Sequence, residues 1–132
     1  GVEYLIVGAF AMALHGKPRM TGDMDVFVHP TLENGRRLMI ALNEFGIIPA
    51  GVKAEDFVEM DTIVQLGRIP GRIDLITTIT GVTWEKAWSN RQAGKLGDAP
   101  VFYLGKTELL DNKRATGRPK DWGDVKLLED LK

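Results

Sequence analysis

Two aspartates separated by one residue, Asp23 and Asp25, are the residues of this sequence best suited to chemistry. They lie in the segment Asp23–Val28, where acidic and apolar residues alternate as on a β-strand with two different faces. Residues two apart on a strand point to the same face, so both carboxylates project together. Close carboxylates repel each other unless a cation lies between them, and Mg²⁺ prefers carboxylate oxygens together with substrate phosphates. The pair therefore indicates a magnesium site, although acids are also common at solvated strand ends.

A third carboxylate, Asp74, lies inside another β-rich run, Arg72–Thr77. Arg72, Asp74 and Ile76 share one face of this predicted strand. Asp74 therefore either pairs with Arg72 or, if the two strands are neighbours, joins the first two acids. Three carboxylates with two divalent ions about 3.5–4 Å apart would form the two-metal geometry of in-line phosphoryl or nucleotidyl transfer. The spacing alone leaves both interpretations open.

Phosphate contacts are suggested by two segments that precede the acids. Gly8 and Ala9 lie at a predicted turn from strand to helix, where a glycine lets the backbone approach a ligand and free N–H groups can face a phosphate. The following loop carries Arg19 and Thr21, which could add a cation and a hydroxyl beside the metal site. The alternatives are a packing glycine in a tight turn and a solvated surface loop.

Four cations lie within eight residues near the C-terminus, namely Lys113, Arg114, Arg118 and Lys120. Arg118 and Lys120 are the better candidates for binding a triphosphate or an acidic acceptor. The alternative is that the cations complement the dipole of a helix C-terminus. Asp121 and Asp124 are expected to cap the last helix and to pair within it.

The elements that must position these residues predict a single α+β (α/β) domain with a mixed sheet flanked by helices. Strands are expected over 2–7, 23–28, 62–66, 72–77 and 101–104, and helices over 9–15, 31–45, 84–88, 107–115 and 119–131. The loop 67–71 closes a hairpin, which excludes a purely parallel sheet. Residues 48–56 are expected to form a connection, and residues 1–104 and 105–132 a catalytic core and a helical tail. His15 is expected to end a helix, and Trp84, Trp88 and Trp122 to anchor the core.

Composition excludes several classes of protein. The chain has 132 residues, 44% of them hydrophobic, and no cysteine, so a disulfide scaffold, a thiolate metal site and a cysteine nucleophile are excluded. Its net charge of -1 provides no overall field for a polynucleotide. The apolar run Tyr4–Leu14 is too short to span a membrane, so the cytoplasm is the expected location. The start at Gly1 rather than Met favours a fragment that lacks an N-terminal helix.

The segment from Tyr4 to Asp25 resembles the opening of a nucleotidyltransferase of the polymerase beta-like superfamily. The matching residues are Tyr4–Ala11, His15, Gly16, Pro18, Arg19, Thr21 and Asp23–Asp25. Such proteins carry a glycine at a strand-to-helix turn, then two acids on the next strand and a third on a neighbouring strand, which is the order of Gly8, Asp23, Asp25 and Asp74. The stretch Lys113–Asp124 resembles the helical tail of small bacterial minimal, abortive-infection and toxin–antitoxin nucleotidyltransferases.

This resemblance implies a nucleotidyltransferase fold and a Mg²⁺- or Mn²⁺-dependent enzyme that transfers an NMP from an NTP, with ATP expected, to a hydroxyl acceptor. Asp23 and Asp25 would bind the metal and the triphosphate, and Asp74 would complete the metal site and help to deprotonate the acceptor. Gly8 and the N–H of Ala9 would contact the triphosphate.

Ala9 departs from the glycine or serine that is usual in the family at this position. The departure motivates a second hypothesis, a non-catalytic nucleotide- or partner-binding module of antitoxin-like or regulatory type. The acceptor remains open between a small molecule, a protein and a tRNA, and a homo-oligomer or a toxin–antitoxin partner is expected.

Overall fold

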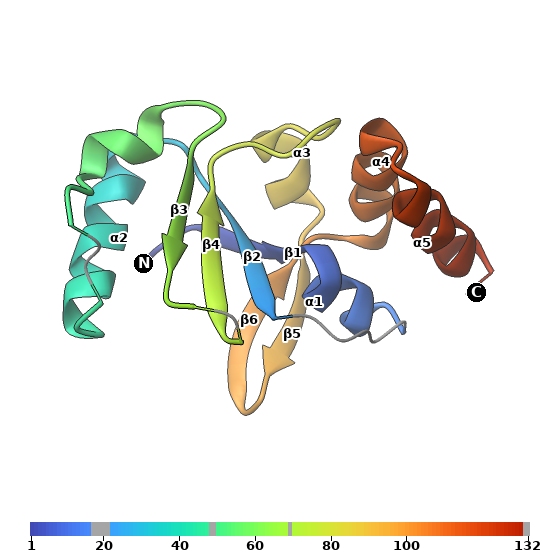
Figure 1. Cartoon of the computed structure of the whole chain (residues 1–132), viewed down its shortest axis with the longest axis horizontal. Coiled ribbons are helices and arrows are strands. Elements are labelled where there is room, and N and C mark those ends of the chain that lie inside the picture. The colour runs from blue at the N-terminus through green and yellow to red at the C-terminus, as the bar shows by residue number, and fades with distance from the viewer. Residues whose placement is uncertain (17–21, 48–49, 69, 131–132) are drawn as a thin grey trace.

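The structure is a computed structural model that describes residues 1–16, 22–47, 50–68 and 70–130. Figure 1 shows the arrangement of its helices and strands. The strands are β1 (Tyr4–Val7), β2 (Asp23–Val28), β3 (Ile63–Leu66), β4 (Arg72–Ile76), β5 (Gln92–Leu96) and β6 (Ala99–Tyr103). The helices are α1 (Gly8–Leu14), α2 (Leu32–Glu44), α3 (Trp84–Ser89), α4 (Lys106–Thr116) and α5 (Pro119–Glu129), with a 3₁₀ helix, η1, at Ala54–Val58.

The strands of the described chain form one mixed sheet in the order β3-β4-β2-β1-β6-β5. The pairs β3–β4, β1–β2 and β5–β6 are antiparallel, whereas β2–β4 and β1–β6 are parallel. In the parallel pair β2–β4, Asp25 lies directly opposite Asp74. The predicted mixed sheet and α+β class are confirmed, and the register places the second and third acids side by side.

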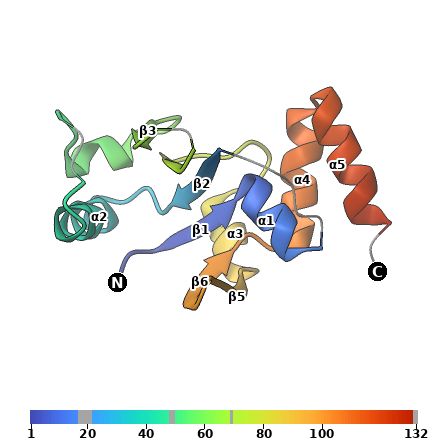
Figure 2. The ribbon, with the colours of Figure 1, turned by 60° about the horizontal axis from the view of Figure 1, so that its bottom comes forward.

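Helices cover the sheet at both ends, as Figures 1 and 2 show, with α2 beside β3 and β4 and the α4–α5 pair beyond α1. One apolar cluster joins β1 to α1, α3, α4 and α5, and includes Leu5, Met12, Phe27, Leu104 and Leu128. A second cluster lies under α2 and η1, and includes Val28, Leu38, Leu42, Phe57 and Leu75. Strand β2 contributes to both clusters, because successive side chains of a strand point to opposite faces. The strand that carries Asp23 and Asp25 is therefore held on both sides.

Three local expectations differ from the structure. The expected connection 48–56 contains the start of η1, which forms because the aromatic ring of Phe57 is fully buried in the second cluster. Strand β5 was not predicted, since Gln92–Leu96 lacks alternating apolar residues and pairs only with β6. Trp122 does not anchor the core, because its exposed fraction is 53%.

The exposure of Trp122 follows from which face of α5 is buried. This helix turns Asp121, Asp124, Val125 and Leu128 inward, so polar residues occupy half of its buried face. Trp84 is a buried core anchor as expected, and its ring stacks on that of Trp88 at a centroid distance of 5.4 Å. Within the described residues, no helix is both long and apolar enough to cross a membrane. The division into 1–104 and 105–132 stays a prediction.

Candidate metal centre and its cleft

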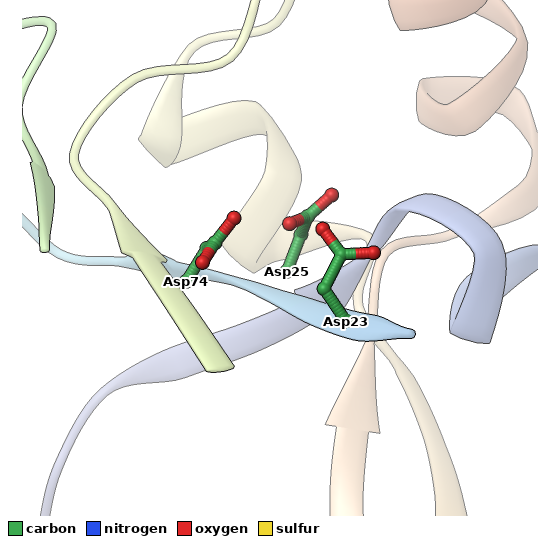
Figure 3. A group of neighbouring side chains, drawn as sticks. All are labelled: Asp23, Asp25 and Asp74. Atoms are coloured by element: carbon green, nitrogen blue, oxygen red, sulfur yellow. The ribbon is translucent and has the colours of Figure 1, made fainter. Parts of the chain in front are cut away.

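Three carboxylates meet at one end of the β2–β4 pair. One oxygen each of Asp23, Asp25 and Asp74 lies within 4.8 Å of the others. Figure 3 shows all three side chains rising from the same side of the sheet, two from β2 and one from β4. Asp74 is the most buried of them, with an exposed fraction of 7%. The convergence that depended on the two strands being neighbours is therefore present in the structure.

Arg72 lies against the same carboxylates and pairs with two of them. Its Nη2 is 3.1 Å from Asp23 Oδ2 and 3.1 Å from Asp74 Oδ2, and its Nε is 2.9 Å from Asp74 Oδ1. The hydrogen bond to Asp74 is the largest of the contributions that raise the pKa of the Arg72 guanidinium. Both interpretations of Asp74 thus hold together, because it pairs with Arg72 and also joins the other acids. One guanidinium faces three carboxylates, which leaves the cluster negative.

The excess of negative charge affects the pKa of Asp25. Burial raises the pKa of its carboxyl above the ordinary value, and repulsion from Asp23 and Asp74 raises it further. Each carboxylate that ionises makes ionisation of its neighbours more costly, unless a cation enters the cluster. The electrostatics of Asp25 therefore favour a bound cation.

The donor set fits a divalent metal ion. Asp74 Oδ1 is buried and accepts no hydrogen bond among the described residues, because Arg72 Nε is close to it but poorly aligned. Apart from its ion pair with Arg72, this buried oxygen therefore has unused capacity to accept, and a metal–ligand bond would satisfy it. The candidate ligands all offer oxygen, which hard divalent cations prefer. The Asp23–Asp25–Asp74 cluster could hold such an ion.

Gly8 is required where β1 turns into α1. Its φ is +66°, in the left-handed region that favours glycine. A Cβ at this position would come within 2.9 Å of Asp25 Oδ2, so any side chain would push against the acidic cluster. The absence of a side chain at residue 8 thus lets the turn lie directly beside Asp25.

The acids open into a cleft of about 1060 Å³. Gly8 and Ala9 line it beside the acids, and it is also lined by Lys113 on α4, Arg118 at the N-cap of α5 and Lys120 on α5. Arg114 does not line it and instead pairs with Glu129 at 2.9 Å. Arg19 and Thr21, which were expected here, lie outside the described residues.

A buried ion-pair network holds the α4–α5 hairpin together. Lys113 Nζ is 3.1 Å from Asp124 Oδ2 and 3.6 Å from Asp121 Oδ1. Arg118 Nε donates to Asp121 Oδ2 at 2.7 Å, and the Thr116 hydroxyl donates to the same oxygen. Although burial alone would raise the pKa of Asp121, the hydrogen bonds from Arg118 and Thr116 outweigh it and hold that pKa well below its ordinary value.

This network corrects one expectation and confirms another. Asp121 caps α5, because its carboxylate accepts from the backbone N–H of Arg118 as predicted. Asp124 was expected to pair within the last helix, but it forms an ion pair with Lys113, which lies on α4. The three-residue spacing of Asp121 and Asp124 puts both acids on one helix face, but their partner could be identified only from the packing of α4 against α5.

Sequence reasoning missed the opposite wall of the cleft. Asp61 and Thr62 lie before β3, Thr78 and Thr80 lie after β4, and Asn112 lies on α4. These residues are isolated in the sequence and form no motif. The pairing of β3 with β4 brings Asp61, Thr62 and Thr78 to one surface, and Asn112 of α4 joins them by donating to the carbonyl of Thr80 at 2.8 Å.

Comparison with known proteins was made by sequence and by structure. No model of a known protein family matches this sequence, and no curated protein matches it either. Several solved structures resemble its fold, among them the two that follow. The lincosamide antibiotic adenylyltransferase LnuA in its lincomycin-bound form has a TM-score of 0.60 and 15% identity, over 99% of this chain and 88% of LnuA. TM1012 from Thermotoga maritima, a protein assigned as a nucleotidyltransferase, has a TM-score of 0.62 and 12% identity, over 99% of this chain and 84% of its own. The chain therefore has the nucleotidyltransferase fold.

Proposed function

We propose that this protein is a Mg²⁺-dependent nucleotidyltransferase that transfers an NMP group from an NTP, with ATP as the expected donor, to a hydroxyl acceptor. The observation that carries the proposal is the cluster of Asp23, Asp25 and Asp74 at the base of a cleft that also holds three cations. The fold of the chain supports the same class of reaction. A cytoplasmic location, a bacterial source and a toxin–antitoxin partner stay expectations from the sequence.

The three aspartates would hold Mg²⁺ or Mn²⁺ in this reaction. When bound, the metal supplies positive charge that polarises the α-phosphate and neutralises the acids. Arg72 is suited to keep Asp23 and Asp74 oriented, since a carboxylate oxygen can ligate a metal and still accept a hydrogen bond.

The triphosphate is assigned to the side of the cleft where the cations lie. Arg118 at the N-cap of α5 and Lys120 in its first turn border it, and Gly8 and Ala9 border it beside Asp25. Charge-assisted hydrogen bonds from arginine and lysine are among the strongest contacts that a phosphate makes in proteins. Ala9 keeps the backbone donor that the role requires and lacks only a hydroxyl.

The chemical step is an in-line displacement at the α-phosphorus. The acceptor oxygen forms a bond to this phosphorus, and the bond from the α-phosphorus to the bridging oxygen breaks. Pyrophosphate leaves with the bonding electrons, and the proton of the acceptor hydroxyl passes to Asp74 and then to solvent. Asp74 suits this role because it is the acid on β4, the strand nearer to the wall without cations.

The test is label transfer from an NTP that carries the label on its α-phosphate. The purified chain is incubated with Mg²⁺, the NTP and three acceptor pools: small metabolites, proteins and tRNA. Asp25→Ala should lower transfer by at least about 100-fold, because loss of even an outer-shell partner of a metal costs 10–100-fold. Asp98→Ala, which removes an exposed acid outside the cleft, is the matched control and should transfer normally.

Two results would contradict the proposal in different ways. Equal transfer by wild type and Asp25→Ala would refute the role of the acidic cluster. NTP binding without transfer to any pool would favour the alternative, a non-catalytic nucleotide- or partner-binding module of the same fold.

A further inference from the structure

The two sides of the cleft differ in charge. The three cations that line it are Lys113 on α4, Arg118 at the N-cap of α5 and Lys120 on α5. The other side is formed by Asp61, Thr62 and Ile63 at the start of β3 and by Thr78 just after β4. Figures 1 and 2 place β3 on the far side of β2 from α4 and α5. Further along the chain, Thr80 returns to α4, where its carbonyl accepts from Asn112 Nδ2 at 2.8 Å and closes the cleft. Among the described residues that line this side, the charged one is Asp61. The acidic cluster lies between the two sides.

The reaction geometry assigns the second side to the acceptor. In an in-line displacement, the attacking oxygen and the leaving group lie on opposite sides of the phosphorus. If pyrophosphate leaves toward the cations of α4 and α5, the acceptor must approach from the β3–β4 side. Asp74, the acid suited to take the proton, is on β4.

Asp61 is held in place at this wall. It has a φ of +57°, which is uncommon for a residue other than glycine. Its backbone N–H donates to Thr78 Oγ1 at 3.1 Å, and the Thr78 hydroxyl donates to Asp61 Oδ1 at 2.8 Å. The next residue, Thr62, is anchored by its N–H to the hydroxyl of buried Thr77 at 3.0 Å. The carboxylate is therefore fixed at the rim of the cleft while it remains accessible to a ligand.

The residues on the β3–β4 side of the cleft favour some classes of acceptor over others. A polynucleotide binds mainly through cations that contact its phosphates, and the described lining of this side offers none. It offers one carboxylate, the hydroxyls of Thr62 and Thr78, and the exposed apolar side chain of Ile63. Such a surface matches a molecule that carries hydroxyl groups and a positive charge.

We propose that the β3–β4 side of the cleft is the acceptor subsite and that it takes a hydroxylated amine whose ammonium group pairs with Asp61. The proposal rests on the proposed function, because the direction of attack follows from the place of the triphosphate. It assigns Asp61 to acceptor binding and selects against acceptors that bring phosphate groups to this wall.

The experiment uses three sugars that differ in charge. The isotopically labelled chain, loaded with Mg²⁺ and a non-hydrolysable ATP analogue, is titrated with glucosamine, glucose or glucose 6-phosphate at neutral pH, and backbone amide shifts are followed by NMR. Glucosamine should shift the amides of Asp61 and Thr78 and bind more tightly than glucose. Glucose 6-phosphate should bind least.

Asp61→Asn tests the residue itself. Asparagine tolerates the left-handed φ and still accepts the Thr78 hydrogen bond, so only the charge is removed. Glucosamine affinity should fall about two- to fivefold, the range for an ion pair open to solvent, and glucose affinity should stay unchanged. Glu59→Gln removes a nearby exposed acid that does not line the cleft, and it should bind glucosamine like wild type.

Several outcomes would overturn the acceptor subsite. These are equal binding of all three sugars, preferential binding of the phosphate sugar, no shift with glucosamine, or no effect of Asp61→Asn. Failure of the proposed function would look different, since the ATP analogue would then leave the amides of Gly8 and Ala9 unshifted before any sugar is added.

Discussion

Replacing Lys113 by methionine should destabilise the protein severely. Its ammonium lies 3.1 Å from Asp124 and 3.6 Å from Asp121, and the exposed fraction of the Lys113 side chain is only 9%. At an effective dielectric constant of about 20, a charge pair 3.1 Å apart attracts by about 5 kcal/mol before desolvation is subtracted. Removing one partner of a buried ion pair costs about 3–5 kcal/mol, because the other charge stays buried. We expect Lys113→Met to lose about that much free energy of unfolding, which corresponds to a fall in Tm of about 10–20 °C.

The assay is urea unfolding followed by tryptophan fluorescence, with a matched surface control. Lys86 pairs with Asp111 at a similar distance of 3.0 Å, but its side chain is 50% exposed. Lys86→Met should therefore cost less than about 1 kcal/mol. The double variant Lys113→Met with Asp124→Leu should recover part of the loss, since an apolar pair of similar volume often replaces a buried ion pair without cost.

The reasoning would be refuted if Lys86→Met and Lys113→Met were equally destabilising. It would also be refuted if the double variant lost as much as the sum of its two single substitutions, because the two charges would then act independently.

Two further predictions concern the acidic cluster. Gly8→Ala should lower the free energy of unfolding by about 1–2 kcal/mol, because alanine is strained in the left-handed backbone conformation of residue 8. It should also weaken Mn²⁺ binding, because the added Cβ would press on the carboxylate of Asp25. Gly46 also has a positive φ, but a Cβ there would meet no atom within 4 Å, so Gly46→Ala should bind Mn²⁺ with the affinity of wild type. Equal Mn²⁺ affinities of Gly8→Ala and Gly46→Ala would contradict the contact between residue 8 and Asp25. The raised pKa of Asp25 means that the folded state binds a proton more tightly than the unfolded state, so the metal-free protein should lose stability as pH rises from 3.8 through the raised value. Asp25→Asn should remove that loss, so this variant should be more stable than wild type at neutral pH in EDTA. Parallel curves of unfolding free energy against pH for the two proteins would disprove the repulsion between Asp25 and the other two acids.

The mixed sheet could be predicted because its signals are short-range. Alternation in Asp23–Val28 marks a strand with two faces, and the glycines at 67 and 71 mark the β3–β4 hairpin. The resemblance to nucleotidyltransferases, which rested on the order of Gly8, Asp23, Asp25 and Asp74, led to the fold that the solved structures share. Where the local signal was weak, as in β5, the prediction failed.

Trp122 and Lys113 illustrate why the helical tail was harder to predict. The sequence predicted that Trp122 anchors the core, but α5 buries Asp121 and Asp124 together with Val125 and Leu128 and leaves Trp122 exposed. That choice depends on Lys113, which enters the interior from α4 and brings the charge that both acids require. A hydrophobic pattern cannot reveal a helix face that is buried through ion pairs.

The sequence by itself determined that Asp23 and Asp25 share a face, because the alternation of side chains along a strand is a local property of the backbone. Tertiary structure alone decided that β4 lies parallel to β2 with Asp74 opposite Asp25, and that Arg72 bridges two of the acids. It also decided that Lys113, Arg118 and Lys120 line the same cleft as Asp61. These relations join residues that are far apart in the chain, and strand pairing and helix packing set them through the burial of two separate apolar clusters.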